Sequence, residues 1–141
     1  MNTYSYSSTE TNYKPSNRSA NTANRSTPTV PQMNYDPNKN VLFIKGKSSG
    51  NGVLPLYQSS IDLIKSHFQN ADELHVYLYI NEVNTLTIKS LFDIFRELQE
   101  HQKAGKHSKV TWFFDHVDQA LMDVVYDFSE LFNVSFVIVP V

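Results

Sequence analysis

The sequence predicts an α/β fold, a single domain in which helices pack on a mixed sheet of four or five strands. Short apolar or alternating segments, typical of strands, take turns along the chain with segments of helical periodicity. The resulting element order is β-β-α-β-α-β-α-β, and strands joined by crossover helices are expected to run parallel. The chain has 141 residues, which is enough for one modest core.

The first part of the chain has the composition of a disordered polar tail. Residues 1–28 are rich in Asn, Ser, Thr and Tyr and contain almost no aliphatic side chains. Such a segment cannot bury enough apolar surface to offset the entropy lost on ordering. The folded domain is therefore expected to span residues 29–141.

The domain is expected to open with a hairpin and a helix. Residues 29–36 read as a strand, placed at a sheet edge by two nearby prolines, and Asp36 to Asn40 is strong turn chemistry. Residues 41–46 form the second, antiparallel strand. A Gly- and Ser-rich loop over residues 47–52 follows, and a helical stripe predicts a helix over residues 54–68.

Two further strand–helix pairs and a last strand complete the pattern. Residues 74–80 alternate as a strand, and the next helix begins after Asn84 and ends before Gly105, a natural C-terminal glycine. Residues 110–114 are a short apolar strand, and Asp118 is suited to cap a third helix. Residues 134–139 are apolar enough to predict a strand buried on both faces.

The start of the second helix has the most informative local chemistry. Asn84 is a good N-cap, which places Thr85 and Thr87 in the first helical turn. A phosphate on a hydroxyl there is favoured by unpaired main-chain N–H groups and by the helix dipole, and Lys89 follows Thr85 by one turn. Capping alone is the simpler interpretation of the same residues.

Composition excludes several function classes. The net charge is −2, so bulk electrostatics do not indicate nucleic-acid binding. The absence of cysteine excludes disulfides, thiol catalysis and thiolate metal sites, and fits a cytoplasmic protein. No secretory signal or membrane-spanning apolar run is evident, so no membrane insertion is expected.

Catalysis and metal binding receive little support from the sequence. Asp115, His116 and Asp118 could bind a divalent metal or serve acid–base chemistry. A helix cap and an exposed turn explain the same residues more simply. No nucleophile elbow or dinucleotide fingerprint is found. We therefore predict a non-enzymatic protein without catalytic residues, metal site or cofactor.

An ordered set of motifs resembles the SiaC family of bacterial regulatory phosphoproteins. At the second helix, N-T-x-[ST]-x-K-x-L matches at Asn84, Thr85, Thr87 and Lys89, with Leu86 in place of a serine. The other motifs are Gly46-Lys47-Ser48 after the second strand, and Trp112-Phe113-Phe114 before acidic residues. The resemblance runs from about Ser26 to the C-terminus.

Two stretches depart from the family pattern. Gly50-Asn51-Gly52 stands where the family usually has a proline and an acidic residue. After the tryptophan strand, Val117 and Gln119 stand in place of acidic residues. The chain therefore lacks the side chains that the family usually has at those positions.

The resemblance implies a fold and a function. The fold would be like that of anti-sigma-factor antagonists (STAS-like), with a SiaC-like regulatory domain over residues 29–141. Phosphorylation of Thr85, or alternatively Thr87, would select partners: a threonine kinase, a PP2C-like phosphatase and a diguanylate cyclase of cyclic-di-GMP signalling. The residues expected to contact partners are Lys47, Ser48, Asn84, Lys89, Asp115 and Asp118.

A second hypothesis needs no phosphorylation. In it the chain is a constitutive scaffold or assembly module, Thr85 is only part of a helix cap, and the tyrosine-rich tail makes the contacts. Deleting residues 1–28 separates the two hypotheses, because only the scaffold should then lose its partner.

Overall fold

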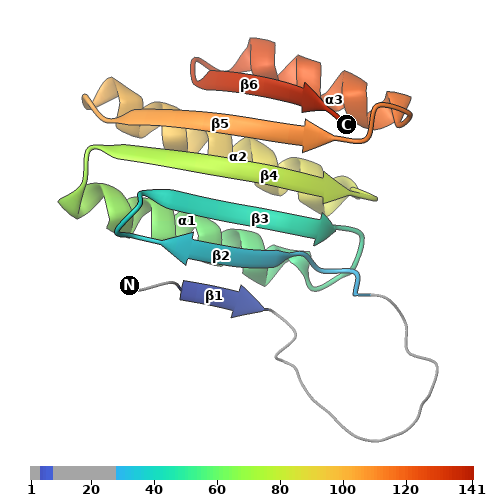
Figure 1. Cartoon of the computed structure of the whole chain (residues 1–141), viewed down its shortest axis with the longest axis horizontal. Helices are drawn as coiled ribbons and strands as arrows, with labels where there is room; N and C mark the ends of the chain where they lie inside the picture. Colours follow the sequence, from blue (N-terminus) through green and yellow to red (C-terminus); the bar gives the residue numbers. More distant parts are fainter. Residues whose placement is uncertain (1–3, 8–27) are drawn as a thin grey trace, which may run out of the picture.

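A computed structural model describes residues 4–7 and 28–141, which form one mixed six-stranded sheet and three helices (Figure 1). The strands lie in the sheet in the same order as in the sequence. The elements are β1 (Tyr4–Ser7), β2 (Gln32–Asp36), β3 (Val41–Lys47), α1 (Val53–Asn70), β4 (Glu73–Asn81), α2 (Thr85–Lys103), β5 (His107–Phe114), α3 (Gln119–Leu131) and β6 (Ser135–Pro140).

The predicted element order is confirmed from β2 onward. Strands β2 and β3 pair antiparallel, and β3 to β6 are parallel, as expected for strands joined by crossover helices. The prediction that Gly105 is the glycine after the end of α2 is also confirmed. This residue has φ +93°, and the N–H groups of Gly105 and Lys106 donate to carbonyls of the last turn of α2, which is a Schellman motif.

Three expectations need correction. Residues 1–28 were expected to lack structure, but Tyr4–Ser7 forms β1, which pairs antiparallel with β2; residues 8–27 lie outside the described residues. Strand β2 is therefore not an edge strand, because β1 takes up its free main-chain groups. Strand β6 is not buried on both faces: it forms the opposite edge, and Val137 is 39% exposed.

All three helices lie on one face of the sheet (Figure 1). Each parallel strand is added beside the preceding one and always in the same direction. Because crossover connections are right-handed, a sheet that never reverses direction has its crossover helices on one side. The core fills the space between that face and the helices, where Leu78, Phe95 and Trp112 are fully buried.

No helix among the described residues is long and apolar enough to cross a bilayer. Helix α2 has 19 residues but carries charged side chains along its exposed side. The fold therefore offers two regions where function can be sought: the carboxyl ends of the parallel strands, and the face without helices.

Candidate functional site at the start of helix α2

The turn between β4 and α2 is tied to the loop that follows β3. The side chain of Asn84 caps α2 by accepting from the Thr87 N–H at 2.8 Å. The main-chain N–H of Asn84 donates to the Ser48 carbonyl at 3.2 Å, and its amide group donates to the Gly50 carbonyl at 3.4 Å. Asn84 therefore fixes the beginning of the helix and its position relative to the neighbouring loop.

A chain of buried hydroxyls braces the same turn. Ser48 Oγ lies 2.8 Å from the Tyr57 hydroxyl and 2.6 Å from Thr87 Oγ1, and both Ser48 and Thr87 have no exposed surface. Thr87 Oγ1 also donates to the Ser48 carbonyl at 2.7 Å. If Tyr57 donates to Ser48 and Ser48 donates to Thr87, every hydroxyl proton in the chain has an acceptor.

Burial of this network has an electrostatic consequence. Desolvation raises the pKa of Tyr57 to about 12, against the smaller lowering effects of its hydrogen bonds to Ser48 and Thr87. The tyrosine therefore remains neutral at physiological pH and holds α1 against the start of α2. Sequence reasoning missed this residue, although Tyr57 lies one helical turn after Val53 on the buried side of α1.

Thr85 differs from Thr87 both in burial and in hydrogen bonding. It is the first residue of α2, its side chain is exposed, and its hydroxyl has no partner among the described residues. Within the same described part of the chain, the N–H groups of Thr85 and Leu86 also lack acceptors, as is usual at a helix start. An anion at Thr85 would meet two free donors and the positive end of the helix dipole.

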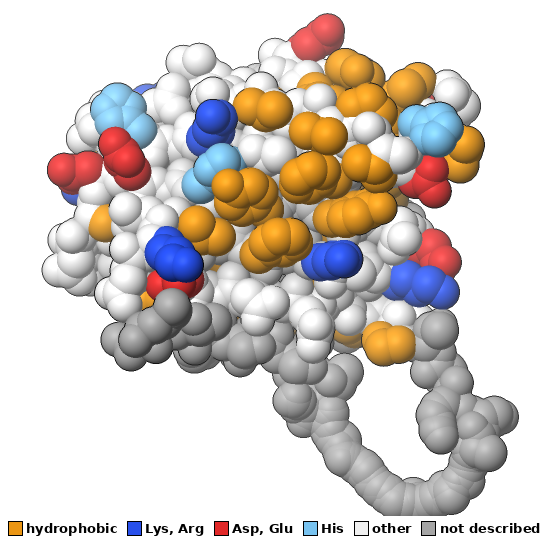
Figure 2. Space-filling model, viewed as in Figure 1, with side chains coloured by type: hydrophobic (Ala, Val, Ile, Leu, Met, Phe, Trp, Pro, Cys, Tyr) orange, Lys and Arg blue, Asp and Glu red, His pale blue; other side chains and the backbone are white. Residues whose placement is uncertain are grey.

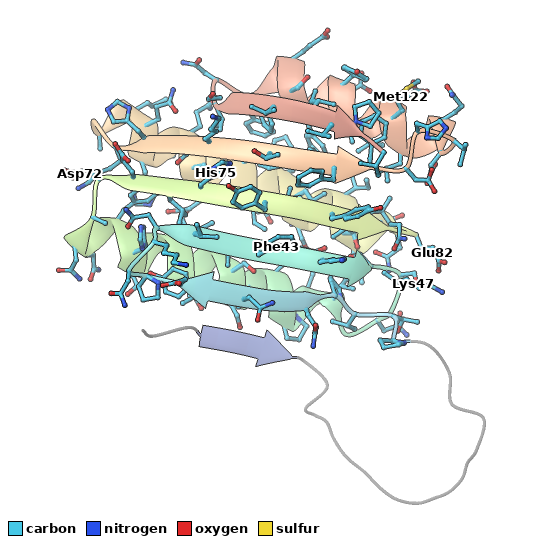
Figure 3. The ribbon with its side chains drawn as sticks, viewed as in Figure 1. Phe43, Lys47, Asp72, His75, Glu82 and Met122 are labelled. Atoms are coloured by element: carbon cyan, nitrogen blue, oxygen red, sulfur yellow. The ribbon has the colours of Figure 1, made fainter. Side chains whose placement is uncertain are left out.

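The lysines predicted to belong to the site lie in different settings. Lys89, one turn after Thr85, is strongly exposed and contacts Asp93 at 3.4 Å. Lys47 lies at the end of β3 and pairs with Glu82 at 3.2 Å, across the carboxyl ends of two adjacent strands (Figure 3). Both ion pairs are exposed, and pairs of this kind are weak enough to be rearranged by a partner.

The second strand-to-helix turn, between β5 and α3, is held by local bonds and by contacts of His116 with Val141. Asp118 accepts from the Leu121 N–H at 3.0 Å and caps α3, and Asp115 accepts from the Val117 N–H at 3.2 Å. His116 Nδ1 donates to the Val141 main-chain oxygen at 2.6 Å. In the part of the chain that the structure describes, no three His, Asp or Glu side chains form a group that could hold a metal ion.

The structure brings together only part of the predicted contact surface. Ser48 and Asn84 lie together, joined by a main-chain hydrogen bond, but Ser48 is buried, so its side chain supports the turn and is not available to a partner. Burial likewise leaves Thr87, the alternative phosphorylation site, inaccessible to a kinase in the folded chain. Among the described residues, no hydrogen bond or ion pair links Asp115 or Asp118 to the α2 turn.

The sequence profile of the SiaC family regulatory phosphoproteins matches residues 24–141, which is most of the chain. The chain belongs to the SiaC family. No curated protein gives a significant match. Membership in the family confirms the resemblance drawn from the motifs at Gly46, Asn84 and Trp112, and it makes this chain a member of a family of regulatory phosphoproteins.

Solved SiaC structures share the fold. The crystal structure of apo-SiaC from Pseudomonas aeruginosa has a TM-score of 0.73 at 23% identity, covering 81% of this chain and 93% of that one. A chain in the crystal structure of the Pseudomonas aeruginosa diguanylate cyclase SiaD in complex with its activator SiaC has a TM-score of 0.75 at 22% identity, covering 82% of this chain and 96% of that one. A third structure, SiaC of Pseudomonas aeruginosa, has a TM-score of 0.73 at 21% identity, covering 87% and 100%.

Proposed function

We propose that this SiaC-family chain is a non-enzymatic switch whose partner binding is set by phosphorylation of Thr85. The observation that carries the proposal is the contrast within one helical turn: the Thr85 hydroxyl is exposed and without a partner among the described residues, whereas Thr87 is buried and hydrogen-bonded. A kinase needs access to the hydroxyl, and only Thr85 provides it.

Helix α2 is suited to hold the modified residue. A phosphate at Thr85 carries about −1.5 to −2 charges and meets the free N–H groups of the first turn. Lys89 lies on the same helical face and can exchange its exposed pair with Asp93 for the phosphate. The modified helix start is therefore stabilised within the chain itself.

The same charge alters what the surface can bind. A partner that packs on the unmodified threonine would have to desolvate the phosphate or face it with its own acidic groups, and both lower affinity. We propose that Asn84, Lys89, Lys47 and the turn carrying Asp115 and Asp118 form the contact surface. The proposed partners are a threonine kinase, a PP2C-like phosphatase and a diguanylate cyclase that the unmodified form activates.

The cyclase assignment is supported by the related complex in which SiaC is the activator of the diguanylate cyclase SiaD. The test uses the chain and the diguanylate cyclase from the same organism. Affinity is measured by biolayer interferometry for the unmodified chain and for chain carrying phosphothreonine at position 85. We expect phosphorylation to weaken binding at least tenfold, which is about 1.4 kcal/mol.

A matched control carries phosphoserine at Ser66, an exposed position on α1 far along the sequence from Thr85. It should bind the cyclase with the affinity of the unmodified chain. Equal binding by the Thr85-phosphorylated and unmodified chains would contradict the switch and favour the constitutive scaffold.

A further inference from the structure

The sheet face opposite the helices has no cover among the described residues (Figure 1). Parallel strands are normally covered on both faces, because crossover helices lie on each side. Here the strand order never reverses, so the connections alone cannot supply a second layer. A face of this kind on a folded domain is a common place for an interaction.

Strand pairing defines the side chains of this face. Three cross-strand rows run over β3, β4, β5 and β6, and we call these twelve residues the open face. The rows are Val41, His75, Lys109 and Ser135; Phe43, Tyr77, Thr111 and Val137; and Lys45, Tyr79, Phe113 and Val139.

The open face is mainly apolar and aromatic. Figure 2 shows its hydrophobic side chains gathered over the middle of the sheet, and Figure 3 places Phe43 and His75 on the same side of the ribbon. The Tyr77 ring stacks on His75 at 4.0 Å and on Phe43 at 5.6 Å between centroids. Binding to a preformed aromatic layer of this kind costs little side-chain conformational entropy.

The charged side chains within the open face are both lysines. Its twelve side chains include two lysines and no carboxylate, and neither Lys45 nor Lys109 has an ion-pair partner within the described part of the chain. Two carboxylates border it on the same side of the sheet: Asp36 on β2, opposite Val41, and Glu73, two residues before His75. Lys45 lies over the Tyr79 ring at 5.6 Å. Burial, and then the charge of Lys109, lower the pKa of His75, so this histidine adds no positive charge at neutral pH.

The dimensions suit one helix better than a second copy of the chain. With strands about 4.8 Å apart and rows two residues apart, the open face has a flat footprint of roughly 400 Å², most of which one helix about 10 Å wide can cover along the diagonal. Two copies would also bring like charges together. Lys45 and Lys109 are about 16 Å apart by sheet spacing, which leaves room for a helix about 10 Å wide between them.

We propose that the open face binds an α-helix of a partner protein, with an apolar stripe on the aromatic centre and acidic side chains on both flanks that pair with Lys45 and Lys109. This surface is separate from the start of α2, which lies in the helical layer on the other side of the sheet (Figure 1). Binding to the open face is therefore independent of Thr85.

The test uses the full chain and two synthetic fluorescent peptides of about 18 residues, which span about 27 Å as helices. Both carry the same leucine stripe; one has glutamate on its flanks and the other has lysine. Fluorescence anisotropy should show saturable binding of the glutamate peptide and at least tenfold weaker binding of the lysine peptide. Chain with both Lys45→Glu and Lys109→Glu should reverse that preference.

Lys65→Glu is the matched control, because Lys65 is an exposed lysine of α1 in the helical layer. It should bind both peptides as the unaltered chain does. Equal affinity for the two peptides, no binding of either, or the same loss with Lys65→Glu would overturn the proposal.

A second measurement distinguishes the partner helix from a second copy of the chain. Val137→Glu places a carboxylate on the open face at a site already 39% exposed, so the fold should tolerate it. It should abolish binding of the glutamate peptide while size-exclusion chromatography with light scattering finds both forms monomeric. A dimer that Val137→Glu dissociates would instead assign the open face to self-association.

Discussion

The two strand-to-helix turns at the carboxyl edge of the sheet look alike in sequence and differ in structure. Each begins its helix with an Asn or Asp cap, at 2.8 Å for Asn84 and 3.0 Å for Asp118. The β4–α2 turn is also joined to the loop after β3 by Ser48 and to α1 by Tyr57. The β5–α3 turn has its local bonds and the contact of His116 with Val141.

The difference explains how one turn can display a modifiable residue. The backbone of this turn is fixed by the buried hydrogen bonds of Thr87, Ser48 and Tyr57. Thr85 can therefore remain exposed without contributing to stability. Charge can then be added at the surface without disturbing the core. The β5–α3 turn has no comparable buried support among the described residues, and it is the weaker candidate for a switch.

The largest expected effect is a loss of folding stability at alkaline pH, which depends on the buried Tyr57 in the β4–α2 network. The pKa of Tyr57 is raised to about 12 by burial, so the folded chain holds this proton more tightly than the unfolded chain, whose tyrosine titrates near 10. Its contribution is complete below pH 10 and is lost as pH rises toward 12, by about 3 kcal/mol. Urea unfolding between pH 8 and 11 checks this.

Two phenylalanine substitutions isolate the effect. Tyr57→Phe should flatten the fall in unfolding free energy above pH 10, at the cost of some stability at neutral pH. Tyr126→Phe, at an exposed tyrosine of α3, should leave the fall unchanged. Parallel curves for all three proteins would show that Tyr57 is not buried as described.

The next contrast lies within the first turn of α2. Thr87→Val keeps the shape of the side chain but removes one of the two hydroxyl partners of Ser48 and the donor to the Ser48 carbonyl, which should lower the free energy of unfolding by about 2 kcal/mol. Thr85→Val should change it by less than about 0.5 kcal/mol, because the side chain is exposed. Equal losses in denaturant titrations would remove the distinction between the two threonines.

A smaller contrast compares the two caps. Asn84→Ala should cost about 2 kcal/mol and Asp118→Ala about 1 kcal/mol, since Asn84 also holds the loop after β3 whereas Asp118 caps only its own helix. Thermal unfolding by circular dichroism measures both. A greater loss for Asp118→Ala would reverse the account of which turn is braced.

The smallest expected effect is that of divalent metal on the β5–α3 turn. A metal held by Asp115, His116 and Asp118 would stabilise the fold by about 2.7 kcal/mol at a concentration of 100 Kd. We expect millimolar Mg²⁺, Mn²⁺ or Zn²⁺ to leave the melting temperature unchanged within about 1 °C. A clear rise, abolished by Asp115→Asn, would instead support a metal site there.

Local patterns were enough to predict the strands from β2 onward, the helices and both caps. The alternation at Leu74–Ile80 and the Asn84 cap depend only on residues that are close in sequence, so the position of the β4–α2 turn was predicted correctly. Burial of Ser48 and Thr87 was not predictable in this way. It depends on contacts between residues 39 positions apart, which require the packing of β3 beside β4.

Features that depend on topology were also beyond local patterns. The apolar run of β6 predicted burial on both faces, but the unreversed strand order left one face without helices. Because of the same arrangement, the alternating side chains of His75, Tyr77 and Tyr79 lie on the face without helices and form part of the open face. Strand β1 was hidden because its four residues lie in a polar segment.

The most direct test of the central claim is mass spectrometry of the chain isolated from its own cells. Trypsin releases Ser66 to Lys89 as one peptide carrying both threonines, and fragment ions separate Thr85 from Thr87. We expect phosphate on Thr85 in part of the population and none on Thr87. Phosphate on Thr87, or none on either residue under several growth conditions, would contradict it.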